Sequence, residues 1–151
     1  MEVKELGHVV LYVRDLERSR RFYRDVLGFR ELGAVGGLAA QAAAFSSGRT
    51  HHELLLIEVG PDAAPLPPGR RLGMYHLGLK IGDSDEELRT AIEELRAAGV
   101  TMTGASDHTV THSLYILDPD EHEIELYIDV QPEVWRDDPS AVFAPIKPLR
   151  L

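Results

Sequence analysis

The stretch GHVVLYVRDLERSRRFYRDVLG, residues 7–28, decides the fold, because a strand, a capped helix and a terminating glycine follow one another within it. Its opening residues are mostly β-branched or apolar and predict a strand over 7–13. Asp15 has the side chain of a helix N-cap, and the apolar spacing after it predicts a helix over 16–27. Gly28 then supplies the residue that often follows the end of a helix.

The same pattern returns later in the chain. MYHLGLKI, residues 74–81, predicts a second opening strand. Asp83 or Ser84 is expected to cap a second helix, and Ser84 and Glu87 have the spacing of a capping box. In the first copy, His8 precedes the capping Asp15 by seven residues. In the second copy, His76 precedes Asp83 by the same seven. The chain is therefore predicted to contain two copies of one strand–helix unit.

Each copy continues with three more short strand candidates. We therefore expect an α+β fold in which two βαβββ modules, residues 5–60 and 74–130, curl their open faces into a shared open-barrel cleft. The proline-containing stretch 61–73 is expected to link the modules within a single domain, residues 1–130. Residues 131–151 are expected to form a C-terminal tail with no element of its own. The further strands are predicted around 29–32, 38–46, 52–59, 100–103, 113–117 and 123–128.

The composition limits the partners of the protein. The 151 residues include 16 Lys and Arg against 25 Asp and Glu, which gives a net charge of −9. Nucleic acids and anionic membranes attract clustered cations, so neither is an expected partner. The absence of cysteine excludes a disulfide, a thiolate nucleophile and a Cys-based zinc site. The polar N-terminus is unlike a signal peptide, and no apolar run approaches the ~20 residues of a membrane span, so we expect a cytoplasmic protein.

Chemistry-bearing side chains gather on the face of each predicted sheet that its helix leaves uncovered. Side chains alternate along a strand, which puts His8 and His76 at matching places on that face. In the last predicted strand, Glu123 and Glu125 share one face. Buried carboxylates are costly unless they are paired. Two imidazoles and a carboxylate that converge would hold a divalent metal as a 2-His-1-carboxylate triad, which leaves open positions on Fe(II) for substrate and oxygen.

Three segments together resemble the vicinal oxygen chelate superfamily, which includes glyoxalase I, type I extradiol dioxygenases, and fosfomycin and bleomycin resistance proteins. The segments are LGHVVLYVRDLERSRRFYRDVLGF, MYHLGLKI and LDPDEHEIELY, and the resemblance covers residues 5–130. It implies the vicinal oxygen chelate fold and the metal ligands His8, His76 and Glu125. Glu123 is the less favoured carboxylate, because the ligand of the family directly precedes the final Leu-aromatic pair.

Two further segments are most similar to single-domain, catechol 2,3-dioxygenase-like extradiol enzymes. THHELLLIE, residues 50–58, resembles the strand in which those enzymes carry an acid–base histidine, which implies that role for His52. SDHTVTHSLYILDP, residues 106–119, resembles the segment with their second active-site histidine and a tyrosine, here His108 and Tyr115. The resemblance implies cleavage of a small aromatic diol by O2 beside one hydroxyl, as in aromatic hydrocarbon catabolism, with Fe(II) or alternatively Mn(II) as the metal.

Two other functions stay open on the sequence. A glyoxalase I-like metal-dependent lyase or isomerase would need a fourth protein ligand on the last strand of the first module. Glu53 would supply it after a register change of one residue, in place of His52. A metal-free, drug-binding resistance-type protein is the third possibility. The tail and the open sheet edges favour a homo-oligomer, a dimer or larger.

Four more residues complete the expectations. His112 is expected to face the other side of its strand from Tyr115, and His122 to be exposed in the DPDEH turn. Asp107 is expected to serve the turn beside it rather than to orient His108. Glu121 stands where the family has glycine, and a left-handed conformation there would cost roughly 1 kcal/mol.

Overall fold

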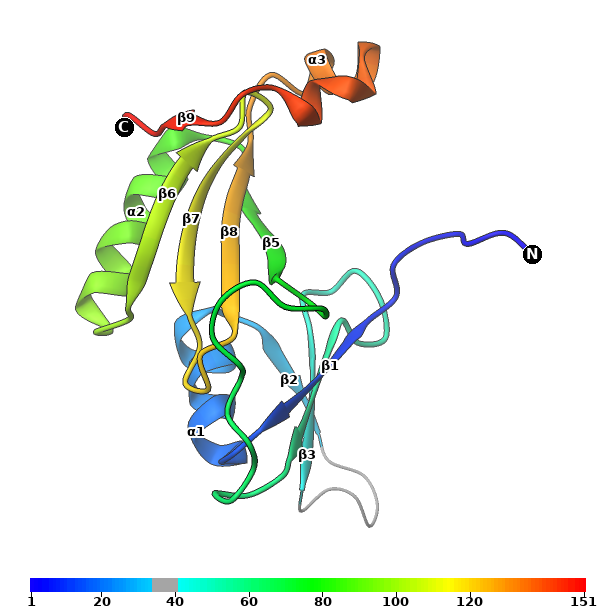
Figure 1. The fold of residues 1–151 in the computed structure, drawn as a ribbon, viewed down its shortest axis with the longest axis vertical. Coiled ribbons are helices and arrows are strands. Elements are labelled where there is room, and N and C mark those ends of the chain that lie inside the picture. The colour runs from blue at the N-terminus through cyan, green and yellow to red at the C-terminus, as the bar shows by residue number, and fades with distance from the viewer. Residues whose placement is uncertain (34–40) are drawn as a thin grey trace. The chain divides into compact units, whose positions relative to one another are not determined.

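The computed structural model describes residues 1–33 and 41–151, and Figure 1 shows its elements. It divides into two compact units, Met1–Leu66 and Pro67–Leu151. The first three residues of the strand predicted over 38–46 lie outside the described residues. Each unit has a sheet and a helix of its own.

The elements of the first unit are β1 (Val9–Val13), α1 (Leu16–Arg21), η1 (Phe22–Val26), β2 (Arg30–Leu32), β3 (Ala42–Ser46) and β4 (Leu54–Glu58). The described strands form a sheet in the order β1-β4-β3-β2, in which only the β1–β4 pair is parallel. α1 continues directly into η1, a π-helical segment. The predicted cap is confirmed, because Asp15 accepts a hydrogen bond from the backbone N–H of Arg18 at 2.8 Å. Gly28 follows the helix with a φ of 72°.

The helix of the first unit packs on one face of its sheet. Leu11 and Val13 on the helix side of β1 are buried, whereas Val10 and Tyr12 on the opposite side are exposed. This alternation is the one that the sequence predicts for a half-covered sheet. The largest side chains that are fully buried in this unit are Tyr23, Phe45, Leu54 and Leu56.

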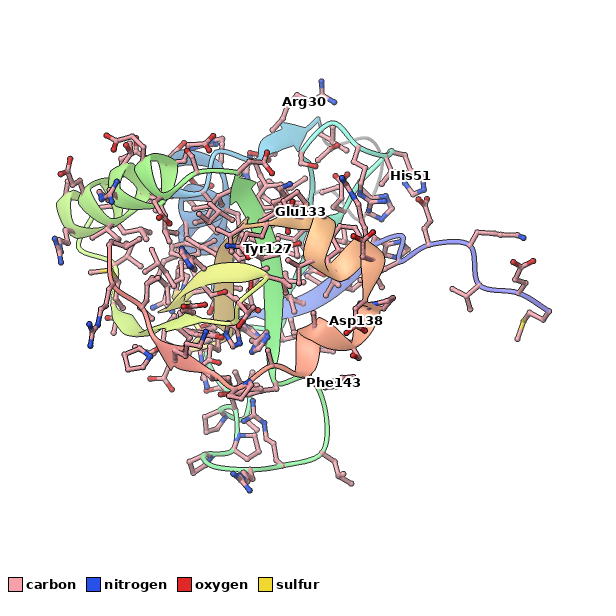
Figure 2. The ribbon with its side chains drawn as sticks, turned by 90° about the horizontal axis from the view of Figure 1, so that it is seen from above. Arg30, His51, Tyr127, Glu133, Asp138 and Phe143 are labelled. Carbon is pink, nitrogen blue, oxygen red and sulfur yellow. The ribbon has the colours of Figure 1, made fainter. Side chains whose placement is uncertain are left out.

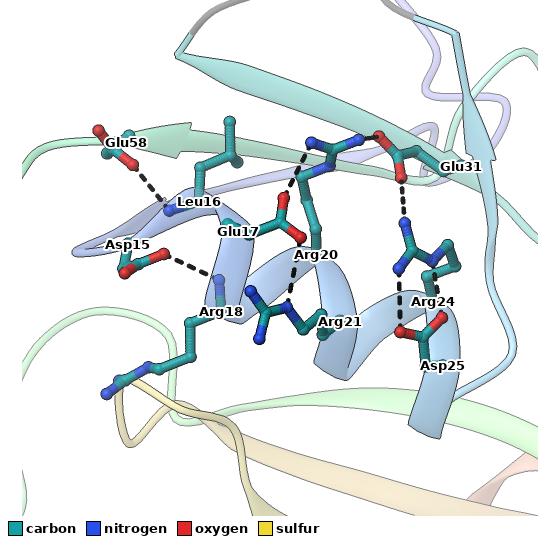
Figure 3. A network of polar contacts seen from close by, with 10 residues as sticks. All are labelled: Asp15, Leu16, Glu17, Arg18, Arg20, Arg21, Arg24, Asp25, Glu31 and Glu58. Carbon is teal, nitrogen blue, oxygen red and sulfur yellow. Dashed lines mark hydrogen bonds and ion pairs between the residues drawn. The ribbon is translucent and has the colours of Figure 1, made fainter.

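A network of polar contacts ties this helix to the sheet (Figure 3). Glu31 of β2 pairs with Arg20 at 2.6 Å and with Arg24 at 3.3 Å. Glu58, at the end of β4, accepts a hydrogen bond from the backbone N–H of Leu16 at 2.8 Å. Exposed ion pairs contribute little individually. The network therefore acts mainly to fix the orientation of the helix on this face.

The second unit contains β5 (His76–Gly82), α2 (Asp85–Ala97), β6 (Met102–Asp107), β7 (Thr111–Leu117), β8 (Glu123–Asp129), α3 (Pro132–Asp137), η2 (Pro139–Phe143) and β9 (Lys147–Pro148). The strand order is β5-β8-β7-β6-β9, and only β5 and β8 are parallel neighbours. Of the two predicted caps of α2, the structure selects Ser84, which accepts from the backbone N–H of Glu87 at 3.4 Å. Glu87 accepts in return from the backbone N–H of Asp83, the residue before the cap, at 2.9 Å.

α2 covers one face of the second sheet. Leu88 and Leu95 of the helix are buried, as are Ile116 of β7 and Ile124 and Ile128 of β8. Side chains on the opposite face of β8, at alternate positions, are only half-buried. The apolar core therefore occupies the helix side of the sheet, and the opposite face is left for polar side chains.

The two units repeat one topology, which confirms the α+β fold with two βαβββ units. In each, the opening strand is followed by a helix and pairs in parallel with the fourth strand of the unit, β4 or β8. The predicted shared cleft stays a prediction. Within residues 1–33 and 41–151, no helix has the length and apolar character needed to cross a membrane.

The C-terminal tail corrects the sequence analysis, which expected no element there. Pro132 and Pro139 each lie at the first turn of a short helix, where the missing N–H of proline costs nothing. β9 then pairs antiparallel with β6, with Pro148 beside Ser106 and Lys147 beside Asp107. The free edge of β6 offers backbone groups that an extended tail can satisfy, and this tertiary pairing has no local sequence signal.

The turn between β7 and β8 corrects a second expectation. The side chain of His122 is 12% exposed rather than solvated, and its Nδ1 lies 3.0 Å from Oδ2 of Asp118. The buried Asp118 carboxylate also accepts hydrogen bonds from the backbone N–H groups of Asp120 and His122. The contact with the Asp118 carboxylate therefore explains why the His122 imidazole is largely buried. Glu121 has a φ of 70°, which confirms the left-handed residue expected in this turn.

The His122–Asp118 pair predicts a pH dependence of stability. Burial alone would lower the pKa of His122, but the hydrogen bond and charge of Asp118, with Asp120, raise it above its ordinary value against the opposing charge of Arg71. A raised pKa stabilises the fold fully below the unfolded-state pKa of about 6.5, and this stabilisation is lost as the pH rises through the folded-state pKa. In urea unfolding, the stability advantage of the wild type over His122→Gln is expected to shrink as the pH rises above about 6.5. A stability advantage of the wild type that grows with pH would contradict a raised pKa of His122 in the folded protein.

Candidate functional site

The second unit gathers one imidazole and two carboxylates on the face that α2 leaves uncovered. The parallel register of β5 and β8 places His76 beside Glu123 and Gly78 beside Glu125. His76 Nε2 lies 3.0 Å from Oε2 of Glu125, and His76 Nδ1 lies 3.6 Å from Oε1 of Glu123. All three side chains are partly buried. Tyr127, labelled in Figure 2, follows Glu125 by two residues on the same face of β8.

A hydrogen-bonded chain extends this cluster across β7. Tyr115 lies opposite Glu125 in the antiparallel register and donates its hydroxyl to Oε1 of Glu125 at 3.3 Å. His108 Nε2 lies 2.8 Å from the same hydroxyl, so the imidazole donates to Tyr115 when that hydroxyl donates to Glu125. Burial, and then the negative charge of Glu125, raises the pKa of Tyr115 to about 12. Tyr115 is therefore a protonated hydrogen-bond donor at neutral pH.

The hairpin between β6 and β7 positions His108. The backbone N–H of His108 donates to the carbonyl of Thr111 at 2.9 Å. Asp107 accepts from the backbone N–H of Thr109 at 2.7 Å, which holds Thr109 at a φ of 72°. Asp107 thus serves the turn, as predicted. His112 faces the other side of the sheet, as predicted, and its Nδ1 lies 2.6 Å from Asp85 of α2.

Removal of the Asp107 side chain is expected to loosen this hairpin. Asp107→Ala leaves the Thr109 N–H without its acceptor in a strained turn, so the free energy of unfolding should fall by about 1 kcal/mol. Asp107→Asn keeps an oxygen acceptor at the same place and should lose less than half of that. Urea denaturation of the two variants and the wild type measures the difference. Equal stability of Asp107→Ala and the wild type would contradict this role.

The first unit gathers three histidines. The backbone N–H of Val9 donates to the carbonyl of Glu53 at 2.9 Å, which holds the start of β1 beside the start of β4. The ring centroids of His8 and His52 are 4.4 Å apart. His51, labelled in Figure 2, lies 4.5 Å from the His52 ring and 6.4 Å from the His8 ring. No role was predicted for His51 from the sequence. Its position next to His52 in the chain was the feature that could have indicated its place in this cluster.

The environment of His52 favours a neutral imidazole. Partial burial is the largest cause that lowers the pKa of His52 below its ordinary value, and the neighbouring His8 and His51 lower it further. The nearby carboxylate of Glu53 opposes this shift without reversing it. A neutral imidazole at pH 7 is able to accept a proton. A lowered pKa of His52 is compatible with the acid–base role that the family resemblance implies, which stays a prediction.

The glyoxalase-like alternative needs Glu53 as a metal ligand, but the Glu53 carboxylate is already bonded within its own loop. Its Oε2 accepts from the backbone N–H of Ser47 at 2.9 Å, and its Oε1 accepts from that of Thr50 at 2.9 Å. Burial would raise the pKa of Glu53, but these hydrogen bonds and that of Ser46 outweigh it and hold the pKa below its ordinary value. Both carboxylate oxygens thus close the β3–β4 loop and are engaged by backbone donors.

Two atoms of the second unit, His76 Nε2 and Glu125 Oε2, have a spacing that suits two of the ligands of one metal ion. Two ligands that lie about 2.1 Å from a metal at a right angle are about 3.0 Å apart. His76 Nε2 and Glu125 Oε2 have that spacing. The other predicted ligand, His8, belongs to the first unit. Within the described ranges, no group of three or more His, Asp or Glu side chains is arranged to hold a metal by itself.

Comparison with known proteins identifies the class. The model of the Glyoxalase/Bleomycin resistance protein/Dioxygenase superfamily matches residues 5–126, so the chain belongs to this superfamily. The chain is 35% identical to the Catechol-2,3-dioxygenase of Bacillus subtilis over 137 residues, which are 91% of this chain and 46% of that protein. It is 30% identical to the Iron-dependent extradiol dioxygenase of Rhodococcus jostii over 147 residues, 86% of this chain and 46% of that protein.

A solved structure supports the fold. A glyoxalase/dioxygenase from Nostoc punctiforme superposes with a TM-score of 0.72 at 23% sequence identity, over 85% of this chain and 92% of that one. At this identity the likeness concerns the fold alone. The chain spans about half the length of the two curated relatives described above.

Proposed function

We propose that the protein is a type I extradiol dioxygenase that opens a catechol-type ring beside one hydroxyl and consumes O2. The observation that carries the proposal is the chain of contacts from His76 through Glu125 and Tyr115 to His108. The chain contains four of the six residues for which the family resemblance implies a role. Similarity to a catechol-2,3-dioxygenase and to an iron-dependent extradiol dioxygenase supports the same reaction.

We propose His8, His76 and Glu125 as the residues that hold Fe(II), with Mn(II) as an alternative for the same donor set. Two neutral imidazoles and one carboxylate leave a net positive charge on a divalent ion, which favours an anionic diol. When bound, the ion supplies chelation of both diol oxygens and the one-electron chemistry that O2 requires. Glu125 contributes the negative charge, and its second oxygen accepts the Tyr115 hydroxyl while no diol is bound.

Tyr115 and His108 are proposed to bind and orient the diol. Because Tyr115 keeps its proton at neutral pH, its hydroxyl is able to donate to a substrate oxygen. His108 lies 2.8 Å from that hydroxyl and is able to donate to it in turn. The pair therefore stabilises negative charge on the bound diol without ionisation of the tyrosine. Its partly buried position limits competition from water.

His52 is proposed as the acid–base residue. A neutral imidazole takes the proton that a diol releases on binding and returns a proton when the ring opens. Its lowered pKa keeps it in the basic form before substrate binds. A small aromatic diol and O2 are the proposed substrates.

The competing functions have less support. A glyoxalase-like lyase would need Glu53 as a fourth ligand, but both oxygens of Glu53 accept backbone hydrogen bonds within its own loop. In a metal-free binding protein, His76 and Glu125 would form a direct imidazole–carboxylate pair at this 3.0 Å distance. The dioxygenase also explains why Tyr115 and His108 extend from the same carboxylate.

Anaerobic reconstitution tests the proposal. The protein is loaded with Fe(II), Mn(II) or Zn(II) in separate samples, mixed with a panel of catechols, and then exposed to air. We expect the yellow ring-opened semialdehyde with Fe(II) or Mn(II), and no colour with Zn(II), which has no redox chemistry. Metal bound in every sample but no product from any diol would contradict the dioxygenase and favour the lyase.

A further inference from the structure

The imidazole of His76 lies between two carboxylates. Its Nε2 is 3.0 Å from Oε2 of Glu125, and its Nδ1 is 3.6 Å from Oε1 of Glu123. A neutral imidazole carries one proton, so it is able to donate to only one of the two. The nitrogen without the proton presents a lone pair, which is the form that binds a metal. The position of this single proton therefore decides whether His76 is a ligand at Nε2.

On the side of the His76 ring that faces Glu123, two polar atoms are buried without a hydrogen bond. Among the described residues, His76 Nδ1 and Glu123 Oε1 are buried atoms that have no hydrogen-bond partner. A buried donor and a buried acceptor that face each other are both satisfied by one hydrogen bond. Closing the 3.6 Å separation by a few tenths of an ångström would form that bond.

The strand register gives Glu123 and Glu125 different places. Glu123 lies directly beside His76 in the parallel β5–β8 pair, whereas Glu125 lies beside Gly78. A Cβ atom at Gly78 would lie 3.6 Å from Oε2 of Glu125, in ordinary van der Waals contact, so the glycine keeps a side chain away from that oxygen. Each carboxylate therefore faces a different nitrogen of the His76 ring, Glu125 the Nε2 atom and Glu123 the Nδ1 atom.

We propose that Glu123 is a positioning residue for the metal-binding histidine. It accepts a hydrogen bond from Nδ1–H of His76, keeps the proton on that nitrogen, and leaves the Nε2 lone pair directed to the ion beside Glu125. This inference rests on the metal site of the proposed function. Ligand histidines commonly bond their second nitrogen to a carboxylate, and loss of such a partner weakens metal binding by about 10- to 100-fold.

Three variants test the proposal. Glu123→Leu removes the acceptor and keeps an apolar side chain of similar size. Glu123→Gln removes the charge but keeps a carbonyl oxygen that accepts from Nδ1–H, so it should rescue the function. Glu121→Gln is the matched control, because it removes the same charge from an exposed residue of the adjacent turn.

Two measurements on the full chain separate positioning from general stability. The first is the dissociation constant of Mn(II), measured by calorimetry. Glu123→Leu is expected to raise it about 10- to 100-fold, whereas Glu123→Gln and Glu121→Gln should stay within about threefold of the wild type. The second is the exchange of the His76 Nδ1 proton with water, followed by ¹⁵N-resolved NMR of the Zn(II)-loaded protein. The wild type should protect this proton from exchange, and Glu123→Leu should let it exchange faster.

The outcomes are distinguishable. Wild type that binds Mn(II) but whose Zn(II)-loaded form leaves the His76 Nδ1 proton unprotected, or Glu123→Leu with unchanged affinity, would overturn the role of Glu123 and leave the proposed function standing. Wild type that binds neither Mn(II) nor Fe(II) would overturn the proposed metal site itself. If Glu123→Leu fails to fold, the protection of the His76 Nδ1 proton in the wild type still decides.

Discussion

Glu125→Gln is expected to abolish metal binding at working concentrations and, with it, ring cleavage. The substitution removes the single negative charge of the proposed ligand set but keeps an oxygen that accepts from Tyr115. Because loss of a partner outside the ligand set costs about 10- to 100-fold in affinity, loss of the ligand charge should cost at least about 100-fold. Calorimetric titration with Mn(II), and iron content after reconstitution, measure this loss.

Turnover of the same variant should fall in proportion to its metal content. The matched control is again Glu121→Gln, in which an exposed carboxylate of the preceding turn is removed and the metal content should stay at the wild-type level. A Glu125→Gln protein that still binds one metal with wild-type affinity would show that Glu125 is not a ligand. Glu123 would then be the carboxylate to examine.

His52→Phe is expected to keep its metal and lose turnover. Phenylalanine fills a similar volume beside the His8 ring, which lies 4.4 Å from that of His52, but it exchanges no proton. General acid–base groups contribute about 10²- to 10⁴-fold to rate, and kcat should fall within that range. Oxygen uptake at saturating diol measures kcat, and calorimetry measures the affinity for the metal.

His112→Phe is the matched control for His52. It makes the same change of side chain on the face of the second sheet that α2 covers, where His112 contacts Asp85. We expect turnover within about threefold of the wild type for this variant. Near-normal turnover of His52→Phe with normal metal content would assign the acid–base role elsewhere.

Much of the fold could be predicted because the same strand–helix unit occurs twice in the chain. The equal spacing from His8 to Asp15 and from His76 to Asp83 marks a repeat. In the structure Asp15 caps α1, and Ser84, the residue after Asp83, caps α2. Strand alternation then placed His76 and the two carboxylates of β8 on one face, and the parallel β5–β8 register confirms that arrangement. These inferences rest on local periodicity, which a sequence shows directly.

Features that depend on tertiary contacts were missed. The pairing of β9 with β6 depends on a free sheet edge, and the burial of His122 depends on the Asp118 carboxylate. The π-helical turn of η1 had no local signal either. Within the candidate site, the sequence alone left open which of Glu53 and His52 serves the site. In the structure the Glu53 carboxylate accepts backbone hydrogen bonds in its own loop. That His8 completes the ligand set stays a prediction, because it rests on the family resemblance.

The most direct test of the proposed reaction is the stoichiometry and position of ring opening. Iron-loaded protein is mixed with a limiting amount of one diol in an oxygen electrode, and the product is identified by NMR. The account predicts one O2 consumed per diol and a product cleaved beside one hydroxyl, a hydroxymuconic semialdehyde. Cleavage between the two hydroxyls, oxidation to a quinone, or no oxygen uptake by metal-loaded protein with any diol would contradict it.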